Sequence, residues 1–190
     1  MPTKHRYYLD TEFIEKPGRI TLISIAIVDD FDNEYYSLSN EYDFHQASDW
    51  VKENVIAPIY ERYLKTSPSE VQPIETFHEV YGVSNKTIAT EILEFINETK
   101  GDGEIEFWAY YADYDWVVLC WLFGIMVDLP SGWPMFCMDL NQSMTERGVE
   151  KLPEPVGAHD ALVDAQWNKK QYHHIYSDRN DDNQNNEPDK

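Results

Sequence analysis

The chain has 190 residues, 42% of them hydrophobic, a length that suits one domain with its own core and no disulfide scaffold. Its 15 basic and 35 acidic side chains give a formal net charge of −20, which excludes a protein that holds nucleic acid through a general positive potential. An enzyme that holds phosphates through divalent ions is not excluded, because carboxylates are the ligands that Mg²⁺ and Mn²⁺ require.

The sequence gives no sign of export or of a membrane span. Its two cysteines, Cys120 and Cys137, cannot form a disulfide framework, and no apolar stretch near Met1 resembles a signal peptide. The longest nearly uninterrupted apolar run, Trp116–Val127, has twelve residues, whereas a bilayer-spanning helix needs about 20. We therefore expect a cytoplasmic protein with no membrane partner.

Three strands are predicted at the start of the chain. Arg6–Phe13 has the alternation of a strand, with Asp10 and Glu12 on one face. Ile20–Val28 is apolar on both faces, as expected of a strand that is covered on both sides. Turn-forming residues follow it, so Glu34–Leu38 should return as a third strand in a hairpin.

Helices and strands are predicted to alternate in the rest of the chain. Ser48 can cap a helix that runs to about Ile59 with a kink at Pro58, and residues 65–83 are expected to be a long irregular connection. The later elements are expected to be a helix between Ser84 and Gly101, a strand over Glu104–Tyr110, a buried helix over Trp116–Met126, a short strand over Met135–Met138 and a final helix over Asp160–Tyr176.

This order of elements predicts an α/β fold in which helices flank a mixed sheet. We expect residues 1–177 to form one domain. Residues 178–190 contain no apolar side chain, so we expect them to be a disordered acidic tail.

Two carboxylates stand at the end of the first predicted strand. Asp10 and Glu12 are two residues apart on one face, about 6–7 Å from each other, a span that one or two divalent ions can bridge. Pairs of this kind are common by chance in so acidic a chain, so the pair alone does not identify a site.

A second candidate lies between a predicted strand and the buried helix. Asp113 and Asp115 both occur there, and Asp115 is placed where the N–H groups of a helix N-terminus stabilise a carboxylate. A capping role therefore explains Asp115 as well as a catalytic role does.

The third candidate opens the last predicted helix. His159 stands at a loop-to-helix boundary with Asp164 five residues later, which places an ionisable base beside a carboxylate. The remaining histidines are expected to lie on the polar side of the last helix or in solvent: His173 and His174 in the first group, and His5, His45 and His78 in the second.

These three signals occur in the order found in a known superfamily. The sequence resembles the histidine branch of the DEDD 3′–5′ exonucleases, and within it the bacterial RNase AS exoribonucleases. The similarity covers roughly residues 6–176, and it is carried by Asp10-Thr-Glu-Phe-Ile-Glu15, Leu22-Ile-Ser-Ile25, Glu34-Tyr-Tyr36, Tyr114-Asp115, Leu119-Cys120 and His159-Asp-Ala-Leu-Val-Asp-Ala165.

The resemblance implies an RNase H-like fold with a sheet of order 3-2-1-4-5. It also implies that His159 is the general base and that the metal ligands are Asp10, Glu12, Asp115 and Asp164. Asp113 departs from the pattern, because a small residue is expected at its position, and this leaves open which acid is the second-motif ligand.

The chemistry implied is hydrolysis with two Mg²⁺ ions, for which Mn²⁺ can substitute, about 3.5–4 Å apart. Asp10 would bridge both ions, Glu12 and Asp164 would bind on the side of the attacking water, and Asp115 on the side of the leaving oxygen. His159 would accept the proton of the water, and the products would be 5′-nucleoside monophosphates.

The substrate implied is the 3′ end of single-stranded, adenylate-rich RNA, and the family also implies a homodimer. Phe13 directly follows the first motif, and we expect it to stack on a base. Two alternatives remain: a DEDD-type 3′–5′ DNA exonuclease with the same metal site, and a non-catalytic acidic domain that binds a basic partner.

Overall fold

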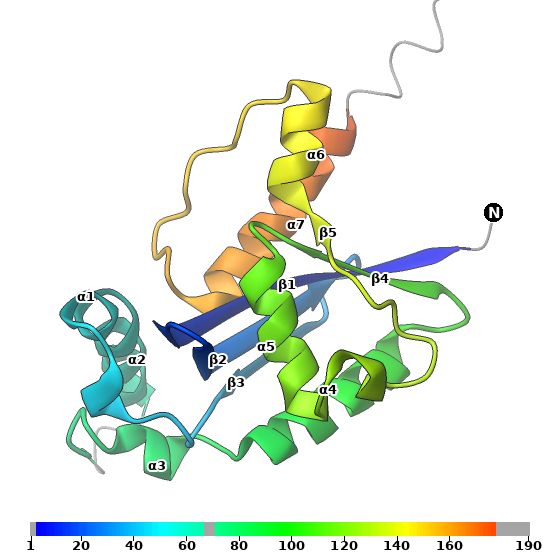
Figure 1. Cartoon of the computed structure of the whole chain (residues 1–190). Coiled ribbons are helices and arrows are strands. Elements are labelled where there is room, and N and C mark those ends of the chain that lie inside the picture. The colour runs from blue at the N-terminus through cyan, green and yellow to red at the C-terminus, as the bar shows by residue number, and fades with distance from the viewer. Residues whose placement is uncertain (1–2, 67–70, 178–190) are drawn as a thin grey trace, which may run out of the picture.

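The computed structural model describes residues 3–66 and 71–177 (Figure 1). The predicted acidic tail, 178–190, lies outside the described residues, and the domain boundary at residue 177 stays a prediction. None of the helices in the described ranges has the length and apolar character needed to cross a membrane.

A five-stranded sheet forms the centre of the molecule, in the order β3-β2-β1-β4-β5. β1, β2 and β3 are antiparallel, and β4 and β5 run parallel to β1. Both the mixed sheet and its predicted order are confirmed. The strands are β1 (Lys4–Lys16), β2 (Arg19–Asp29), β3 (Glu34–Leu38), β4 (Glu104–Ala109) and β5 (Met138–Asp139).

Helices cover both faces of the sheet (Figure 1). On one face, Tyr7, Leu9 and Phe107 pack with α4 (Asn85–Thr99) and α5 (Asp113–Phe123) in the largest core cluster. On the other face, α7 (Ala161–Ser177) contacts β1 and β2, and α6 (Leu140–Arg147) packs against α7. Burial on both faces explains why most side chains of β2 are apolar.

A separate group of helices packs at one end of the sheet. It consists of η1 (Phe44–Gln46), α1 (Asp49–Val51), η2 (Lys52–Ile56), α2 (Ala57–Thr66) and α3 (Phe77–Tyr81). Val55, Ile59 and Phe77 from this group form a second core with Ile14 and Ile23 of the sheet. We call residues 49–66, which run continuously from α1 through α2, the helical arm.

Several predicted elements differ from the structure. The connection 65–83 was expected to be irregular, but it contains α3. The helical arm has the expected cap, a hydrogen bond from the Val51 N–H to the Ser48 hydroxyl. A kink was expected at Pro58, and the structure has the π-helical segment η2 just before this residue. The fifth strand is Met138–Asp139 rather than Met135–Met138, and α6 was not predicted from the sequence. A short helix, η3 (Met126–Asp128), follows α5.

Two histidines expected in solvent are buried instead. His5 lies 3.1 Å from the Asp29 carboxylate, and the His78 ring stacks on Tyr42 with a centroid distance of 4.0 Å. Both partners come from other elements, so the local sequence gave no signal of them.

β1 is longer than its neighbour β4, and this difference creates the site. The last pair between the two strands joins Tyr8 to Trp108, whereas β1 continues to Lys16 beside β2 alone. A bulge lies between Glu12 and Phe13. Beyond Tyr8, the edge of β1 that faced β4 is therefore open to other partners.

Candidate active site

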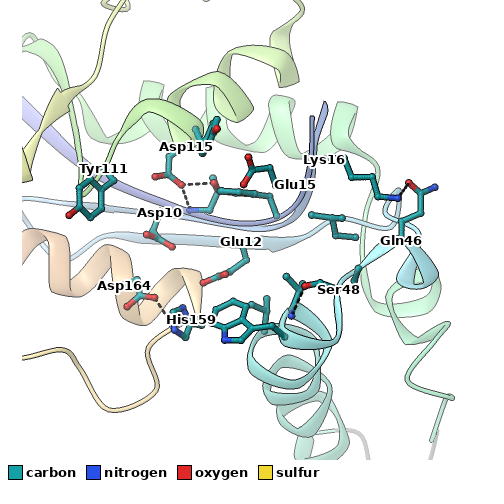
Figure 2. Close-up of a pocket in the computed structure, with 18 of the residues that line it drawn as sticks. Asp10, Glu12, Glu15, Lys16, Gln46, Ser48, Tyr111, Asp115, His159 and Asp164 are labelled. Atoms are coloured by element: carbon teal, nitrogen blue, oxygen red, sulfur yellow. Dashed lines mark hydrogen bonds between the residues drawn. The ribbon is translucent and has the colours of Figure 1, made fainter. Parts of the chain in front are cut away.

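Asp10 and Glu12 lie on the part of β1 that extends beyond β4. Both side chains point to the same side of the strand, toward the beginning of α7 (Figure 2). This arrangement agrees with the period-two alternation expected for a strand. The two carboxylates therefore converge as the sequence predicted.

Asp115 reaches the same place from α5. The helix begins at Asp113, so Asp115 lies in its first turn rather than at its cap. Its Oδ1 accepts two hydrogen bonds from Thr11, one from the backbone N–H at 2.9 Å and one from the hydroxyl at 2.5 Å. Because β4 no longer pairs with β1 at Thr11, the Asp115 carboxylate accepts the hydrogen bond that a neighbouring strand would otherwise accept from the Thr11 N–H. Asp113, in contrast, is exposed. This geometry favours Asp115 over Asp113 as the second-motif acid.

Asp164 and His159 come from α7 and from the loop before it. The backbone N–H of His159 donates a 2.7 Å hydrogen bond to Oδ2 of Asp164. The sequence predicted proximity of the imidazole and the carboxylate, and the structure adds that the backbone also joins them. His159 adopts a φ of 68°, a left-handed conformation that is uncommon for a residue other than glycine.

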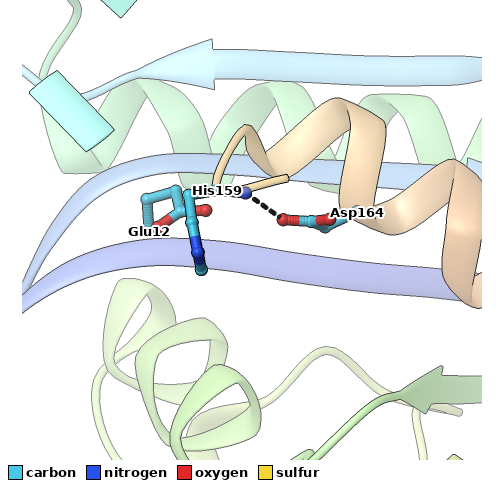
Figure 3. A group of neighbouring side chains, drawn as sticks. All are labelled: Glu12, His159 and Asp164. Atoms are coloured by element: carbon cyan, nitrogen blue, oxygen red, sulfur yellow. Dashed lines mark hydrogen bonds between the residues drawn. The ribbon is translucent and has the colours of Figure 1, made fainter. Parts of the chain in front are cut away.

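Three of these side chains have the composition of a metal site. One ligand atom from each of Glu12, His159 and Asp164 lies within 4.8 Å of the others (Figure 3). The carboxylate oxygens of this group are ligands that suit Mg²⁺ and Mn²⁺. The donor set therefore fits divalent ions.

The electrostatics of the site also favour the binding of cations. Among the described residues, no lysine or arginine forms an ion pair with Asp10, Glu12, Asp115 or Asp164. Burial, and then the neighbouring carboxylates, hold the pKa of Asp10 well above its usual range. The same causes raise the pKa of Glu12 to about 8. A group of acids with so little local compensation is suited to bind cations.

The pKa values of Asp115 and Asp164 are raised as well. Burial raises the pKa of Asp115 to about 7, although the hydrogen bonds from Thr11 act in the opposite direction. Burial also raises the pKa of Asp164, against the effect of the hydrogen bond from His159. All four carboxyl groups therefore have a higher pKa than usual.

A cavity of about 680 Å³ opens beside the acids. It is lined by all five predicted site residues, and by Phe13, which also contacts the Tyr114 ring edge-on at a centroid distance of 5.8 Å. Lys16 and Gln46 line it too, joined by a 3.3 Å hydrogen bond from Nζ to Oε1 (Figure 2). The cavity combines anionic, aromatic and amide groups, which is the chemistry that a metal-dependent nucleic-acid site needs.

Two further residues of the site were not predicted from the sequence. Trp50 of α1 lines the cavity with 53% of its surface exposed, and its ring meets that of His159 edge-to-face at 4.8 Å. Thr11, whose backbone N–H and hydroxyl both donate to Asp115, also lines the cavity. No local pattern signals either role, because both depend on elements that are distant in the sequence.

Comparison with known proteins identifies the family. Residues 5–176 match the family described as the 3′-5′ exoribonuclease Rv2179c-like domain. The chain belongs to this family. Two relatives, the 3′-5′ exoribonucleases MT2234.1 and Rv2179c from two strains of Mycobacterium tuberculosis, are each 37% identical over 161 residues, which are 84% of this chain and 86% of each relative.

A solved structure supports the fold of this Rv2179c-like domain. The Mg²⁺- and Mn²⁺-bound form of S. pombe Pop2p has a TM-score of 0.50 and 12% sequence identity, and the match covers 93% of this chain and 84% of that one. The predicted RNase H-like fold is thereby confirmed, and the family match confirms the predicted relationship to 3′-5′ exoribonucleases. The matched residues 5–176 include every predicted site residue.

Proposed function

We propose that this protein is a metal-dependent 3′–5′ exoribonuclease that shortens single-stranded RNA from its 3′ end and releases 5′-nucleoside monophosphates. One observation carries the proposal: four carboxylates and an imidazole from three separate parts of the chain meet at one cavity. Membership of an exoribonuclease family supports the substrate class.

The four carboxylates of Asp10, Glu12, Asp115 and Asp164 would hold the metal ions. Two Mg²⁺ ions, or Mn²⁺ in their place, would supply a more acidic water and a charge that stabilises the leaving 3′-oxygen. That a solved structure with the same fold is the Mg²⁺- and Mn²⁺-bound form supports this choice of metals. In the protein, the hydrogen bonds from Thr11 fix one oxygen of Asp115, and the strand geometry of β1 fixes Asp10 and Glu12.

His159 would accept the proton of the attacking water. Its side chain is exposed, and a ring nitrogen lies within 4.8 Å of carboxylate oxygens of Glu12 and Asp164. An imidazole is the side chain best suited to general base catalysis at neutral pH. Its place beside the acids puts it within reach of a water held by them.

The cavity would receive the nucleotides at the 3′ end. Phe13 is only partly buried there, and stacking of a base on an aromatic ring contributes about 1–3 kcal/mol. Gln46 offers an amide, the side chain that pairs with the edge of adenine. These two features support a preference for adenylate-rich ends.

We further propose a cytoplasmic homodimer. Both cysteines are free, as is usual in a reducing compartment. Large apolar side chains are exposed at the end of α5 and in the turn after it, namely Trp121, Ile125 and Val127, and a second copy would cover them. Analytical ultracentrifugation of the wild type and Trp121→Ser tests this, because a monomer in both would refute it.

The activity is tested with a 5′-labelled oligo(A) and Mg²⁺. We expect a ladder of products that shorten from the 3′ end, release of AMP, and no reaction when EDTA is present or when the 3′ end is blocked. Asp10→Asn should be inactive, whereas Asp102→Asn, an exposed acid far from the cavity, should react like the wild type.

The same assay separates the alternatives. Internal fragments, or activity that survives EDTA, would refute the proposal. Faster shortening of a matched DNA oligomer would identify a DNA exonuclease. No cleavage of either oligomer by the wild type would favour an acidic binding domain.

A further inference from the structure

The segment that carries His159 has few contacts of its own. Residues 154, 156 and 157 are exposed, and Val156 is fully exposed at 102%. The earlier part of this loop is held by α7, where Gln171 accepts a 2.8 Å hydrogen bond from the Leu152 N–H and Trp167 donates one of 2.9 Å to the Pro153 carbonyl. The position of His159 therefore depends on contacts made at its own end of the loop.

Two of those contacts come from the helical arm, residues 49–66. At its beginning, the Trp50 indole meets the His159 ring edge-to-face, with an interplanar angle of 79°. About three turns further on, the Arg62 guanidinium donates a hydrogen bond to Oδ2 of Asp160, the residue directly after His159. One rigid element thus touches both residues of the His159–Asp160 dipeptide.

The Arg62 contact is itself well oriented. The guanidinium lies over the ring of Tyr36 on β3, 4.8 Å from the centroid. Its partner Asp160 uses Oδ1 to accept the N–H of Leu162 in the first turn of α7. Asp160 is therefore fixed from two directions, and Arg62 balances the charge of one more acid beside the four carboxylates.

We propose that Trp50 and Arg62 are positioning residues that hold His159 against the carboxylates. The inference rests on the proposed function, in which His159 is the general base. The left-handed backbone at His159 needs such support, because a residue other than glycine leaves this conformation unless its surroundings fix it. Both residues act through His159 and neither contributes to binding of the metal ions.

The kinetic test uses Arg62→Met and Trp50→Leu on oligo(A). Misplacement of a catalytic group by about 1 Å can cost about 100-fold in rate, so we expect kcat to fall about 10- to 100-fold for each variant with KM and the Mg²⁺ midpoint nearly unchanged. Arg62→Lys should recover part of the loss. Arg147→Met is the matched control, because the Arg147 guanidinium also stacks on a tyrosine, 4.1 Å from the Tyr176 centroid, but at the end of α7 opposite to His159.

A second measurement does not depend on activity. In the metal-free protein, the His159 signal in the ¹H–¹³C spectrum of the histidine rings would be assigned as the one that is absent from His159→Ala. Arg62→Met and Trp50→Leu should both move or broaden this signal, while that of exposed His45 stays in place. A protein without nuclease activity would still give this result, so the positioning role and the proposed function can fail separately.

The double variant Arg62→Met/His159→Ala tests whether Arg62 acts through His159. If Arg62 acts through His159, Arg62→Met should leave the residual rate of His159→Ala nearly unchanged. An equal loss in both backgrounds, or a His159 signal that does not respond to Arg62→Met, would overturn the proposal.

Discussion

Glu12→Gln should stabilise the protein when metal ions are absent. Burial, followed by the charges of Asp164 and Asp115, raises the pKa of Glu12 from 4.5 to about 8. Since this folded-state pKa lies above the unfolded value, the folded protein binds more protons than the unfolded chain between these two pH values. The stability of the metal-free protein therefore falls as the pH rises from about 4.5 to about 8.

The size of the effect follows from the same numbers. At pH 7, Glu12 is still largely protonated in the folded protein, whereas it is ionised in the unfolded chain. At about 1.4 kcal/mol per pH unit between 4.5 and 7, this difference costs about 3 kcal/mol. Glutamine is nearly isosteric and carries no such cost, so the melting temperature of Glu12→Gln should rise by about 6–12 °C.

Calorimetry in EDTA at pH 5 and pH 7 measures this directly. The advantage of Glu12→Gln should be small at pH 5 and large at pH 7, and Glu15→Gln, an exposed acid on the same strand, should change little at either pH. With saturating Mn²⁺ the order should reverse, because the ions stabilise the wild type through its ionised carboxylates. A lower melting temperature of Glu12→Gln in EDTA, or equal stabilisation of both proteins by Mn²⁺, would refute the reasoning.

Three further predictions concern the ligands and the charge. Asp115→Asn should lower turnover of oligo(A) about 10³-fold at saturating Mg²⁺, whereas exposed Asp113→Asn should stay within about two-fold of the wild type; the opposite result would make Asp113 the ligand. Thr11→Val should weaken Mn²⁺ binding about 10-fold in calorimetric titrations, because it removes the hydroxyl that holds Asp115, while Thr11→Ser should retain the affinity. Because the protein and RNA are both anionic, kcat/KM should rise between low and moderate KCl, and a steady fall would show that a local basic path guides the substrate.

The sequence predicted those features that depend on neighbouring residues. The alternation in β1 placed Asp10 and Glu12 on one face, and the structure agrees. The turn after β2 produced the expected hairpin with β3. A signal for α6 was also present, because Asp139 caps that helix and Gly148 ends it with a φ of 66°, but only Leu140 and Met144 mark its apolar face. That face was too narrow to recognise.

The remaining features depend on contacts between distant segments. Whether Asp115 caps a helix or joins the site is decided by the length of β4, since the Thr11 N–H needs a new partner where that strand ends. The roles of Trp50 and Arg62 require the packing of the helical arm against the beginning of α7. No pattern in either segment contains that information.

The proposed metal ligands lie on helices and a strand of the core, whereas the proposed general base lies in a loop. The four acids lie on β1, α5 and α7, and both helices pack on the sheet that contains β1, so the mutual geometry of the acids is fixed even though their charges repel one another. His159, the proposed general base, instead lies at the end of an exposed loop, where side chains from the helical arm contact it and its neighbour Asp160. Substitutions in the arm can therefore change the rate of the proton transfer while the metal site keeps its affinity. Substitutions around Thr11 should do the reverse, which makes the two functions of the site separable by experiment.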